Sequence, residues 1–154
     1  MVGAESAAFT INSTSGVATI NGIPEYETKT SYIFSFIVRH ATGSSHTQAV
    51  TLIRNDLAPA ISSASTANIN EGVPAGTTVY TAAATDPAGG NVTYSLVVGG
   101  DSTAFTINST TGVVTINGIP DYETITSYNF SLNASDANGL FNTHAVTINV
   151  NDLA

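Results

Sequence analysis

The chain has 154 residues, of which only 9% are charged, and its net charge is −8. Lys29, Arg39 and Arg54 are its only basic side chains, so it lacks the clustered cations that nucleic-acid binding requires. The seven carboxylates after Pro59 have no Lys or Arg among them, which suggests either bound metal cations or solvated surface acids. Cysteine is absent, which excludes disulfides and thiolate metal sites.

The composition favours β-structure. Thr, Val, Ile, Ser, Asn and Gly are abundant, and no segment has the 3.6-residue apolar period of a long helix. No stretch reaches the roughly 20 apolar residues of a transmembrane helix, and no secretory signal is visible at Met1. We therefore expect an all-β chain without membrane insertion.

An internal repeat organises the sequence. At an offset of 96 residues, 34 of the 54 positions from Glu5 to Ala58 are identical to their counterparts in residues 101–154. Residues 1–58 therefore match only the second half of a unit that spans 59–154. The sequence NDLAPAIS, which includes Pro59, is typical of a linker between repeats.

Alternating apolar residues then predict short strands along the chain. In the truncated copy, Tyr32, Phe34, Phe36 and Val38 alternate with other residues on one predicted strand. In the full unit, strands are expected at 67–70, 77–85, 91–97, 105–107, 113–116, 128–134 and 146–150. About seven strands in 96 residues is the size of a Greek-key β-sandwich.

Catalytic motifs are not recognisable, and we expect no enzyme. The three histidines have no partnered nucleophile, and the sequence has no GxSxG or HExxH motif. PEYE at 24–27 and PDYE at 120–123 each carry two carboxylates two residues apart, which on a strand share one face. That arrangement suits a hard cation better than the acid and base of a glycosidase.

Taken together, the segments of the full unit resemble the cadherin repeat in its bacterial cadherin-like form. The resemblance rests on the following segments in order: INEGVPAGTTV (69–79), ATDPAGGNVTYSL (84–96), FTINSTTGVVTI (105–116), the PDYE turn, FSLNASDANG (130–139) and VTINVNDLA (146–154). It implies a seven-strand Greek-key sandwich that binds calcium at the junction between successive repeats. Neighbouring repeats of the same chain are then its first partners.

The resemblance also implies the metal ligands. For the junction between the two copies, the upper repeat would supply Glu25, Glu27, Asn55 and Asp56, and the lower would supply Asp86, Asp136 and carbonyl oxygens near Asn91. The upper half of a second junction would be formed by Glu71, Asp121, Glu123, Asn151 and Asp152.

Three departures from the family pattern reduce the number of ligands. The paired aspartates of the family become Asp86-Pro87-Ala88, and the acid before the linker becomes Ile53 in one copy and Asn149 in the other. The early glutamate of the truncated copy has no counterpart in the chain. Because Ca²⁺ takes 6–8 oxygen ligands, we expect one or two ions at the junction and not three. The alternative is that these acids only form turns and bind no metal.

Two functions remain open. The first is a calcium-stiffened spacer or adhesion module of a large bacterial surface or secreted adhesin, in a tandem array. The second is a carbohydrate-binding module of a secreted polysaccharide-degrading enzyme, with surface polysaccharide as its partner. The absence of Trp disfavours the second.

Residues 1–58 lack the first strands of their sandwich, so we expect their apolar inner face to be uncovered. The other face is partly apolar as well, because Ile33, Ile37 and Ile53 stand where the full unit has Asn129, Asn133 and Asn149. Disorder, completion by a strand-rich neighbour and self-association are the possible outcomes, and we favour a symmetric homodimer.

Overall fold

The computed structural model describes residues 1–26 and 28–153. It divides into two compact units, Met1–Asp56 (unit 1) and Leu57–Ala154 (unit 2). Strands dominate both units, and the only helices among the described residues are two 3₁₀ turns, η1 (Ser6–Ala8) and η2 (Ser102–Ala104). No described helix has the length and apolar character needed to cross a membrane.

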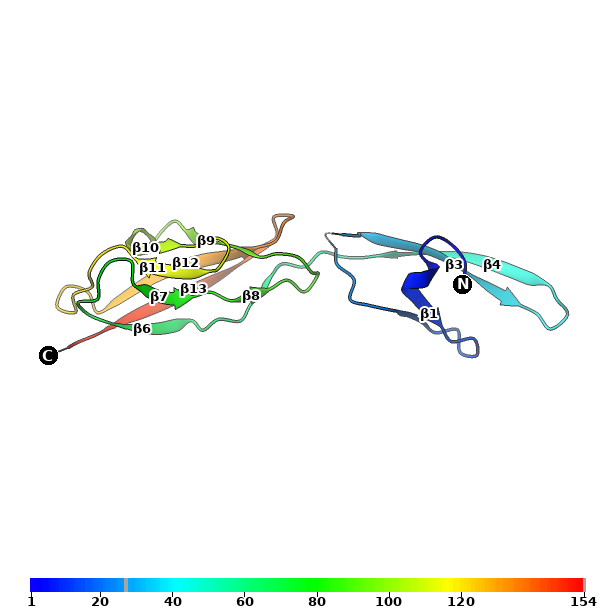
Figure 1. Cartoon of the computed structure of the whole chain (residues 1–154), viewed down its shortest axis with the longest axis horizontal. Helices are drawn as coiled ribbons and strands as arrows, with labels where there is room; N and C mark the ends of the chain where they lie inside the picture. Colours follow the sequence, from blue (N-terminus) through cyan, green and yellow to red (C-terminus); the bar gives the residue numbers. More distant parts are fainter. Residues whose placement is uncertain (27, 154) are drawn as a thin grey trace. The chain divides into compact units, whose positions relative to one another are not determined.

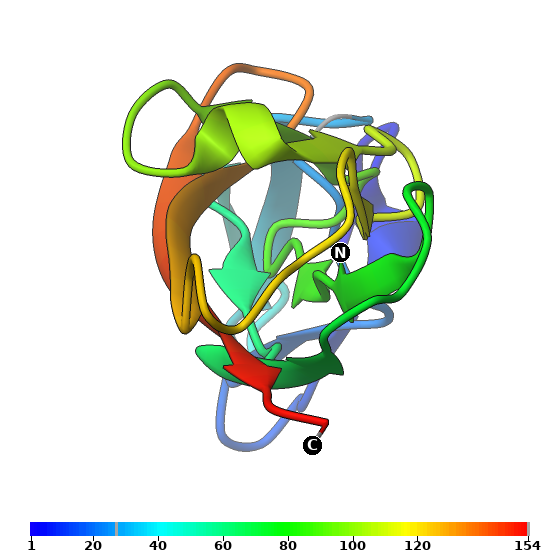
Figure 2. The same ribbon diagram turned by 90° about the vertical axis from the view of Figure 1, so that its left-hand side faces the viewer.

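Unit 2 is a β-sandwich (Figures 1 and 2). Its strands are β5 (Ala60–Ile61), β6 (Thr66–Asn70), β7 (Thr78–Thr81), β8 (Ala84–Thr85), β9 (Thr93–Val97), β10 (Phe105–Ile107), β11 (Val113–Ile116), β12 (Ser127–Ser135) and β13 (Phe141–Asn151). One sheet has the order β10-β11-β7, the other β6-β13-β12-β9, and β5 pairs with β8. In the end-on view, β12 and β13 (orange to red) lie on one side and β7 (green) on the other.

The core of unit 2 lies between these two sheets. Phe130, Leu132 and Ala134 alternate along β12 and are buried, as are Val146, Ile148 and Val150 along β13. Phe105 and Tyr80 of the other sheet pack on Phe130 with ring centroids 4.7 and 6.4 Å away. The period of two that predicted these strands thus reflects one buried face.

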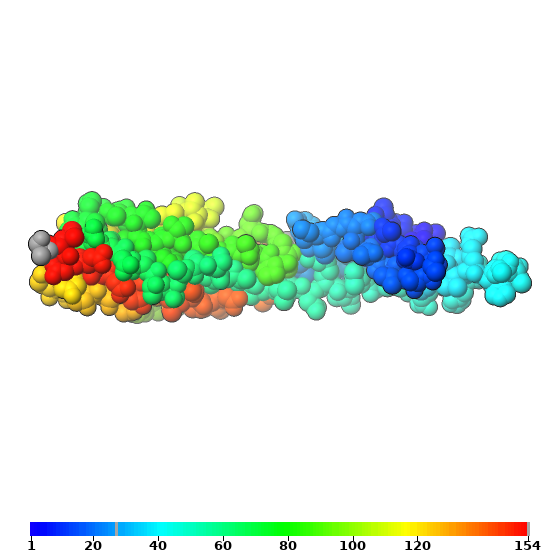
Figure 3. Space-filling model, turned by 90° about the horizontal axis from the view of Figure 1, so that it is seen from below, coloured from blue at the N-terminus to red at the C-terminus, as the bar shows by residue number. Residues whose placement is uncertain are grey.

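The four-stranded sheet has a mixed topology. β12 pairs antiparallel with both β13 and β9, whereas β6 pairs parallel with β13. In Figure 3 the first strands of unit 2 (green) lie along the C-terminal residues (red). Strands of the first half of the unit therefore cover both edges of the β12–β13 hairpin.

The predicted strand at 77–85 is wrong in one respect, because the structure divides it. β7 pairs with β11, whereas β8 pairs with β5. The break falls where the backbone N–H of Ala82 donates to the carbonyl of Gly112, at 2.9 Å. That carbonyl lies in the β10–β11 turn. After β7 the chain therefore passes beside this turn, and its next strand, β8, pairs with β5.

Unit 1 repeats the second half of unit 2. It contains β1 (Phe9–Ile11), β2 (Ala18–Ile20), β3 (Ser31–Arg39) and β4 (Ser45–Ile53). β1 pairs with β2 and β3 with β4, and Phe9 lies opposite Ile20 as Phe105 lies opposite Ile116. The 96-residue sequence repeat is thus also a repeat of strand register.

The expectation of an uncovered inner face in unit 1 is only partly correct. Phe34 is 6% exposed, because Phe9 of the β1–β2 hairpin packs on it with ring centroids 4.4 Å apart. Val38, four residues along the same face, is 58% exposed. The hairpin therefore covers the first part of β3 and leaves its end bare.

Candidate metal centre

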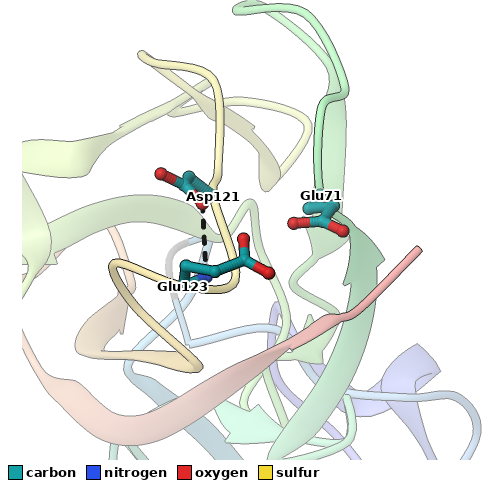
Figure 4. A group of neighbouring side chains, drawn as sticks. All are labelled: Glu71, Asp121 and Glu123. Carbon is teal, nitrogen blue, oxygen red and sulfur yellow. Dashed lines mark hydrogen bonds between the residues drawn. The ribbon is translucent and has the colours of Figure 1, made fainter. Parts of the chain in front are cut away.

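Three of the predicted ligands come together at the end of unit 2 where β13 ends. Glu71 follows β6, and Asp121 and Glu123 lie in the turn before β12. Each offers a carboxylate oxygen, and these oxygens lie within 4.8 Å of one another. Figure 4 shows Glu71 facing the turn that carries Asp121 and Glu123. Because Ca²⁺ binds clustered carboxylate oxygens, this arrangement fits a hard cation.

Backbone hydrogen bonds hold Glu71 in this position. Its two carboxylate oxygens accept from the N–H of Tyr122 at 3.0 Å and of Leu153 at 2.6 Å. Its own N–H donates to the carbonyl of Asn151 at 3.1 Å, and the amide of Asn151 donates to Asn70. Glu71 therefore ties the acidic turn to the segment that carries the two remaining predicted ligands, Asn151 and Asp152.

The two turn carboxylates have opposite pKa shifts. A hydrogen bond from the Thr124 hydroxyl, 2.7 Å from an Asp121 oxygen, lowers the pKa of Asp121, and a hydrogen bond from Glu123 lowers it further. The pKa of Glu123 is raised. A backbone hydrogen bond acts in the lowering direction there, but the hydrogen bond with Asp121 and the charge of Glu71 outweigh it. A cation would relieve this repulsion.

Asp136 lies at the opposite end of unit 2. It follows β12, and a strand of nine residues is about 30 Å long, so this end is well separated from Asp121 and Glu123. Asp136 is 6% exposed, and its Oδ1 accepts from the backbone N–H of Asn138 at 2.8 Å and Leu140 at 2.9 Å. Its Oδ2 is buried without a hydrogen-bond partner. A buried charged oxygen with no partner is costly, and a metal ion would compensate it.

Asp86 repeats this pattern at the same end of unit 2. Its Oδ1 accepts from the N–H of Ala88 at 2.7 Å, and its Oδ2 is also buried without a partner. Thr85, next to it, pairs with Ala60, while the amide of Asn142 near Asp136 donates to the carbonyl of Pro59. Both acids thus lie beside the first residues of the unit, where the resemblance places the lower half of a junction.

The remaining predicted ligands belong to unit 1. The backbone carbonyl oxygen of Glu25 accepts hydrogen bonds from the N–H of Lys29 at 3.0 Å and from the Thr28 hydroxyl at 3.0 Å. Asn55 and Asp56 follow β4, and Glu27 lies outside the described residues. Coordination by residues of both units stays a prediction.

Sequence reasoning missed two features of these sites. The first is the pair of uncompensated oxygens on Asp86 and Asp136, which depends on burial. The second is Arg54, whose guanidinium donates to the carbonyls of Pro24 at 2.6 Å and Lys29 at 3.0 Å and so holds the acidic turn of unit 1. Arg54 occupies the position of Val150, and that exchange of an apolar residue for a cation was the available signal.

Similarity to known proteins points to one family. The family described as "Cadherin domain" matches residues 65–151. Human Cadherin-23 is 32% identical over 137 residues, which is 85% of this chain and 4% of that protein. Cadherin-99C of Drosophila melanogaster is 33% identical over 85 residues, or 55% of this chain and 5% of that protein. The chain thus spans a small fraction of these relatives.

Solved structures agree in fold. Mouse Cadherin-23 EC22-24 matches with a TM-score of 0.60 at 24% identity, over 95% of this chain and 50% of that one. Protocadherin gammaB7 EC3-6, described as a cis-dimer, matches with a TM-score of 0.62 at 24% identity, over 94% of this chain and 40% of that one. These findings give no support to the carbohydrate-binding alternative. The chain belongs to the cadherin domain family, a family of extracellular adhesion modules and not of enzymes.

Proposed function

We propose that this chain is a calcium-binding segment of a large extracellular adhesin. In this proposal residues 59–154 are a complete cadherin repeat, and residues 1–58 are the C-terminal half of the repeat before it. Calcium between successive repeats stiffens the array, which acts as a spacer and adhesion module. The relatives reported above are animal proteins, so a bacterial source stays a prediction from the sequence.

The observation that carries the proposal is the buried carboxylate of Asp136. Its Oδ1 has two backbone donors, whereas its Oδ2 is buried with none. A buried polar oxygen without a partner is costly, and a bound cation would supply the missing partner. Two backbone donors on one oxygen, and a buried second oxygen without a donor, fit a metal ligand.

Two ligand sets follow from the family pattern. At the start of unit 2, Asp86 and Asp136 would bind calcium together with Glu25, Glu27, Asn55 and Asp56 of the preceding half-repeat. At its end, Glu71, Asp121 and Glu123 would bind calcium with Asn151 and Asp152, and a following repeat would complete the site. All are oxygen ligands, as Ca²⁺ requires. Calcium supplies positive charge there, and the chain's residues supply the oxygens.

Calcium titration of the whole chain tests the proposal. We expect a heat of binding by calorimetry, and a melting temperature that rises at millimolar Ca²⁺. Native-state binding at a hundredfold excess over Kd contributes about 2.7 kcal/mol of stability. Extracellular modules bind calcium with Kd values of about 10⁻⁴–10⁻³ M.

Two variants locate the ion. Asp136→Asn should weaken calcium binding at least tenfold. Asp101→Asn is the matched control: Asp101 accepts the Asn129 N–H at 2.7 Å, belongs to neither ligand set, and should leave calcium affinity unchanged. No heat of binding and no shift in melting temperature for the unaltered chain would overturn the proposal.

A further inference from the structure

Unit 1 carries two cations at positions that are apolar in unit 2. At the offset of 96 residues, Arg54 corresponds to Val150 and Lys29 to Ile125. Val150 is buried on β13, so its exchange for arginine places a guanidinium where unit 2 has core. A partly buried guanidinium needs hydrogen-bond acceptors. The acidic turn of unit 1 (residues 24–26, 28 and 29) provides them.

The guanidinium of Arg54 joins the first and the last residue of this turn. Nη2 donates to the carbonyl of Pro24 at 2.6 Å, and Nη1 donates to the carbonyl of Lys29 at 3.0 Å. Cζ lies 6.0 Å from the centre of the Tyr26 ring, in the range of a cation–π contact. The backbone N–H of Arg54 donates to the carbonyl of Thr30 at 2.9 Å. One residue directly after β4 thus holds the turn at both ends.

Lys29 anchors the end of the turn a second time. Its ammonium pairs with the carboxylate of Glu5, and the other oxygen of that carboxylate accepts the backbone N–H of Ile33 in β3. Its Nζ also lies 5.1 Å from the centre of the Tyr32 ring. Its own N–H donates to the carbonyl of Glu25 at 3.0 Å and closes the turn. No residue before Glu5 takes part in these contacts.

Unit 2 holds the corresponding turn with different groups. Glu71 accepts the N–H groups of Tyr122 and Leu153, and the Thr124 hydroxyl donates to Asp121. The two acids that hold this turn are themselves predicted calcium ligands.

In unit 1 the oxygens that accept from Arg54 belong to backbone carbonyls. The side chain of Glu25 is exposed and takes no part in these bonds. The turn of unit 1 is therefore held by groups other than its predicted ligand carboxylates.

We propose that Arg54 and Lys29 form a brace that keeps the acidic turn of unit 1 folded when no calcium is bound. A ligand that is already ordered loses less conformational entropy on binding, so the brace raises calcium affinity at the junction. The charge of the guanidinium acts in the opposite direction, because it repels Ca²⁺. The order of the turn is independent of calcium, whereas the effect on affinity rests on the proposed function.

Amide hydrogen exchange in EDTA tests the brace. The readout is the N–H of residue 29 in the ¹⁵N-labelled whole chain. In Arg54→Val, which installs the residue of unit 2, we expect this N–H to exchange at least tenfold faster relative to the amides of β3 and β4. The N–H of Ile125, which donates to the carbonyl of Asp121 at 2.9 Å in unit 2, should keep its rate.

Three further variants define which feature of the cations matters. Arg54→Lys keeps the charge but not the two separate nitrogens that reach two carbonyls, so residue 29 should exchange as fast as in Arg54→Val. Lys29→Ile removes the anchor on Glu5 and should also accelerate exchange at residue 29. Arg39→Val is the matched control: it removes an exposed arginine from the far end of β3 and should leave this rate unchanged.

Calcium titration of the same proteins tests the effect on affinity. The amide shifts of Asn138 and Leu140, which donate to Asp136, report binding at the start of unit 2. Arg54→Lys should weaken this binding at least fivefold. Arg54→Val should weaken it less at low salt, because it also removes the repelling charge, and the two variants should agree at about 0.5 M NaCl, where the charge is screened.

Unchanged exchange at residue 29 in Arg54→Val would overturn the brace, as would exchange in Arg54→Lys that matches the unaltered chain. Calcium affinity that Arg54→Lys leaves unchanged would overturn the effect on binding. If the unaltered chain binds no calcium, the proposed function and the effect on affinity fail together, while the exchange rates in EDTA still decide the brace.

Discussion

The two carboxylate oxygens of Asp136 have different surroundings: one accepts backbone hydrogen bonds, and the other is buried without a partner. Without calcium, its buried Oδ2 carries charge that no hydrogen bond compensates. Asparagine retains an oxygen for the N–H groups of Asn138 and Leu140 but removes this charge. The effect of Asp136→Asn on stability should therefore change sign with calcium.

In EDTA we expect Asp136→Asn to be neutral or to raise the free energy of unfolding by about 1 kcal/mol, because a buried neutral amide without a partner costs less than a buried charge without one. With millimolar Ca²⁺ the variant should be the less stable protein. Chemical denaturation with and without calcium measures both values. Equal destabilisation in the two conditions would indicate a structural role alone.

Glu123 makes the metal centre sensitive to pH. Its raised pKa means that it takes up a proton at higher pH than an ordinary glutamate, while the lowered pKa of Asp121 keeps that group ionised to lower pH. A protonated carboxyl is a poor calcium ligand. Calcium affinity should therefore fall as pH decreases from 8 to 5.

Calorimetry at the two pH values measures this fall, and Glu123→Gln should reduce its size. In the calcium-free chain, a fall in pH affects the folding stability in opposite directions through Asp121 and through Glu123. The contribution of Asp121 is lost as pH falls through its folded pKa, whereas the penalty at Glu123 is relieved on protonation. Equal calcium affinity at pH 5 and pH 8 would instead indicate coordination by carbonyl oxygens.

Among the elements, the two copies of the β-turn at Gly16 and Gly112 offer an internal comparison. Both glycines have positive φ, 75° and 71°. A Cβ on Gly112 would lie 2.6 Å from the carbonyl oxygen of Ala82, whereas a Cβ on Gly16 would meet nothing within 4 Å. The difference arises because in unit 2 the chain just after β7 runs beside the turn, where the N–H of Ala82 donates to the carbonyl of Gly112.

Gly112→Ala should therefore destabilise unit 2 by about 2–4 kcal/mol, from backbone strain together with a forced displacement of the chain at Ala82. Gly16→Ala should cost unit 1 only the strain of a left-handed residue, about 1 kcal/mol. Denaturant unfolding followed separately in each unit gives both values. Equal costs would mean that the contact at Ala82 relaxes freely.

At the scale of the whole molecule, the two units differ in the size of their cores. In unit 1, Phe9 and Phe34 are the buried apolar residues among those described, whereas unit 2 has a continuous buried cluster from Ile69 to Val150. Burial of apolar area contributes about 25 cal/mol per Å², so the unit with fewer buried side chains is the less stable.

Hydrogen exchange should therefore be faster for the amides of β3 and β4 than for their counterparts in β12 and β13. We expect the protection factors to differ by at least a hundredfold in EDTA, because local stability follows buried contacts. Mass spectrometry of exchanged peptides from the whole chain measures both hairpins at once. Equal protection would show that the bare end of unit 1 is covered in solution.

Several features could be predicted from the sequence because they depend on local pattern. The period of two placed the strands at 105–107 and 113–116 with the bounds that the structure gives them, and the two copies found by the 96-residue repeat form hairpins of equal register. The predicted ligands Glu71, Asp121 and Glu123 are brought together in the folded unit. Each of these predictions needs only side-chain chemistry and spacing.

Other features were decided only by the tertiary structure. The division of the strand at 77–85, the burial of Phe34 under Phe9, and the bare oxygens of Asp86 and Asp136 depend on which segments pack together. Local pattern does not fix burial: Ile20 and Val50 are only partly buried, whereas the identical residues Ile116 and Val146 of unit 2 are buried. The sequence determines which face of each strand is apolar, but whether that face is buried depends on which other segment packs against it.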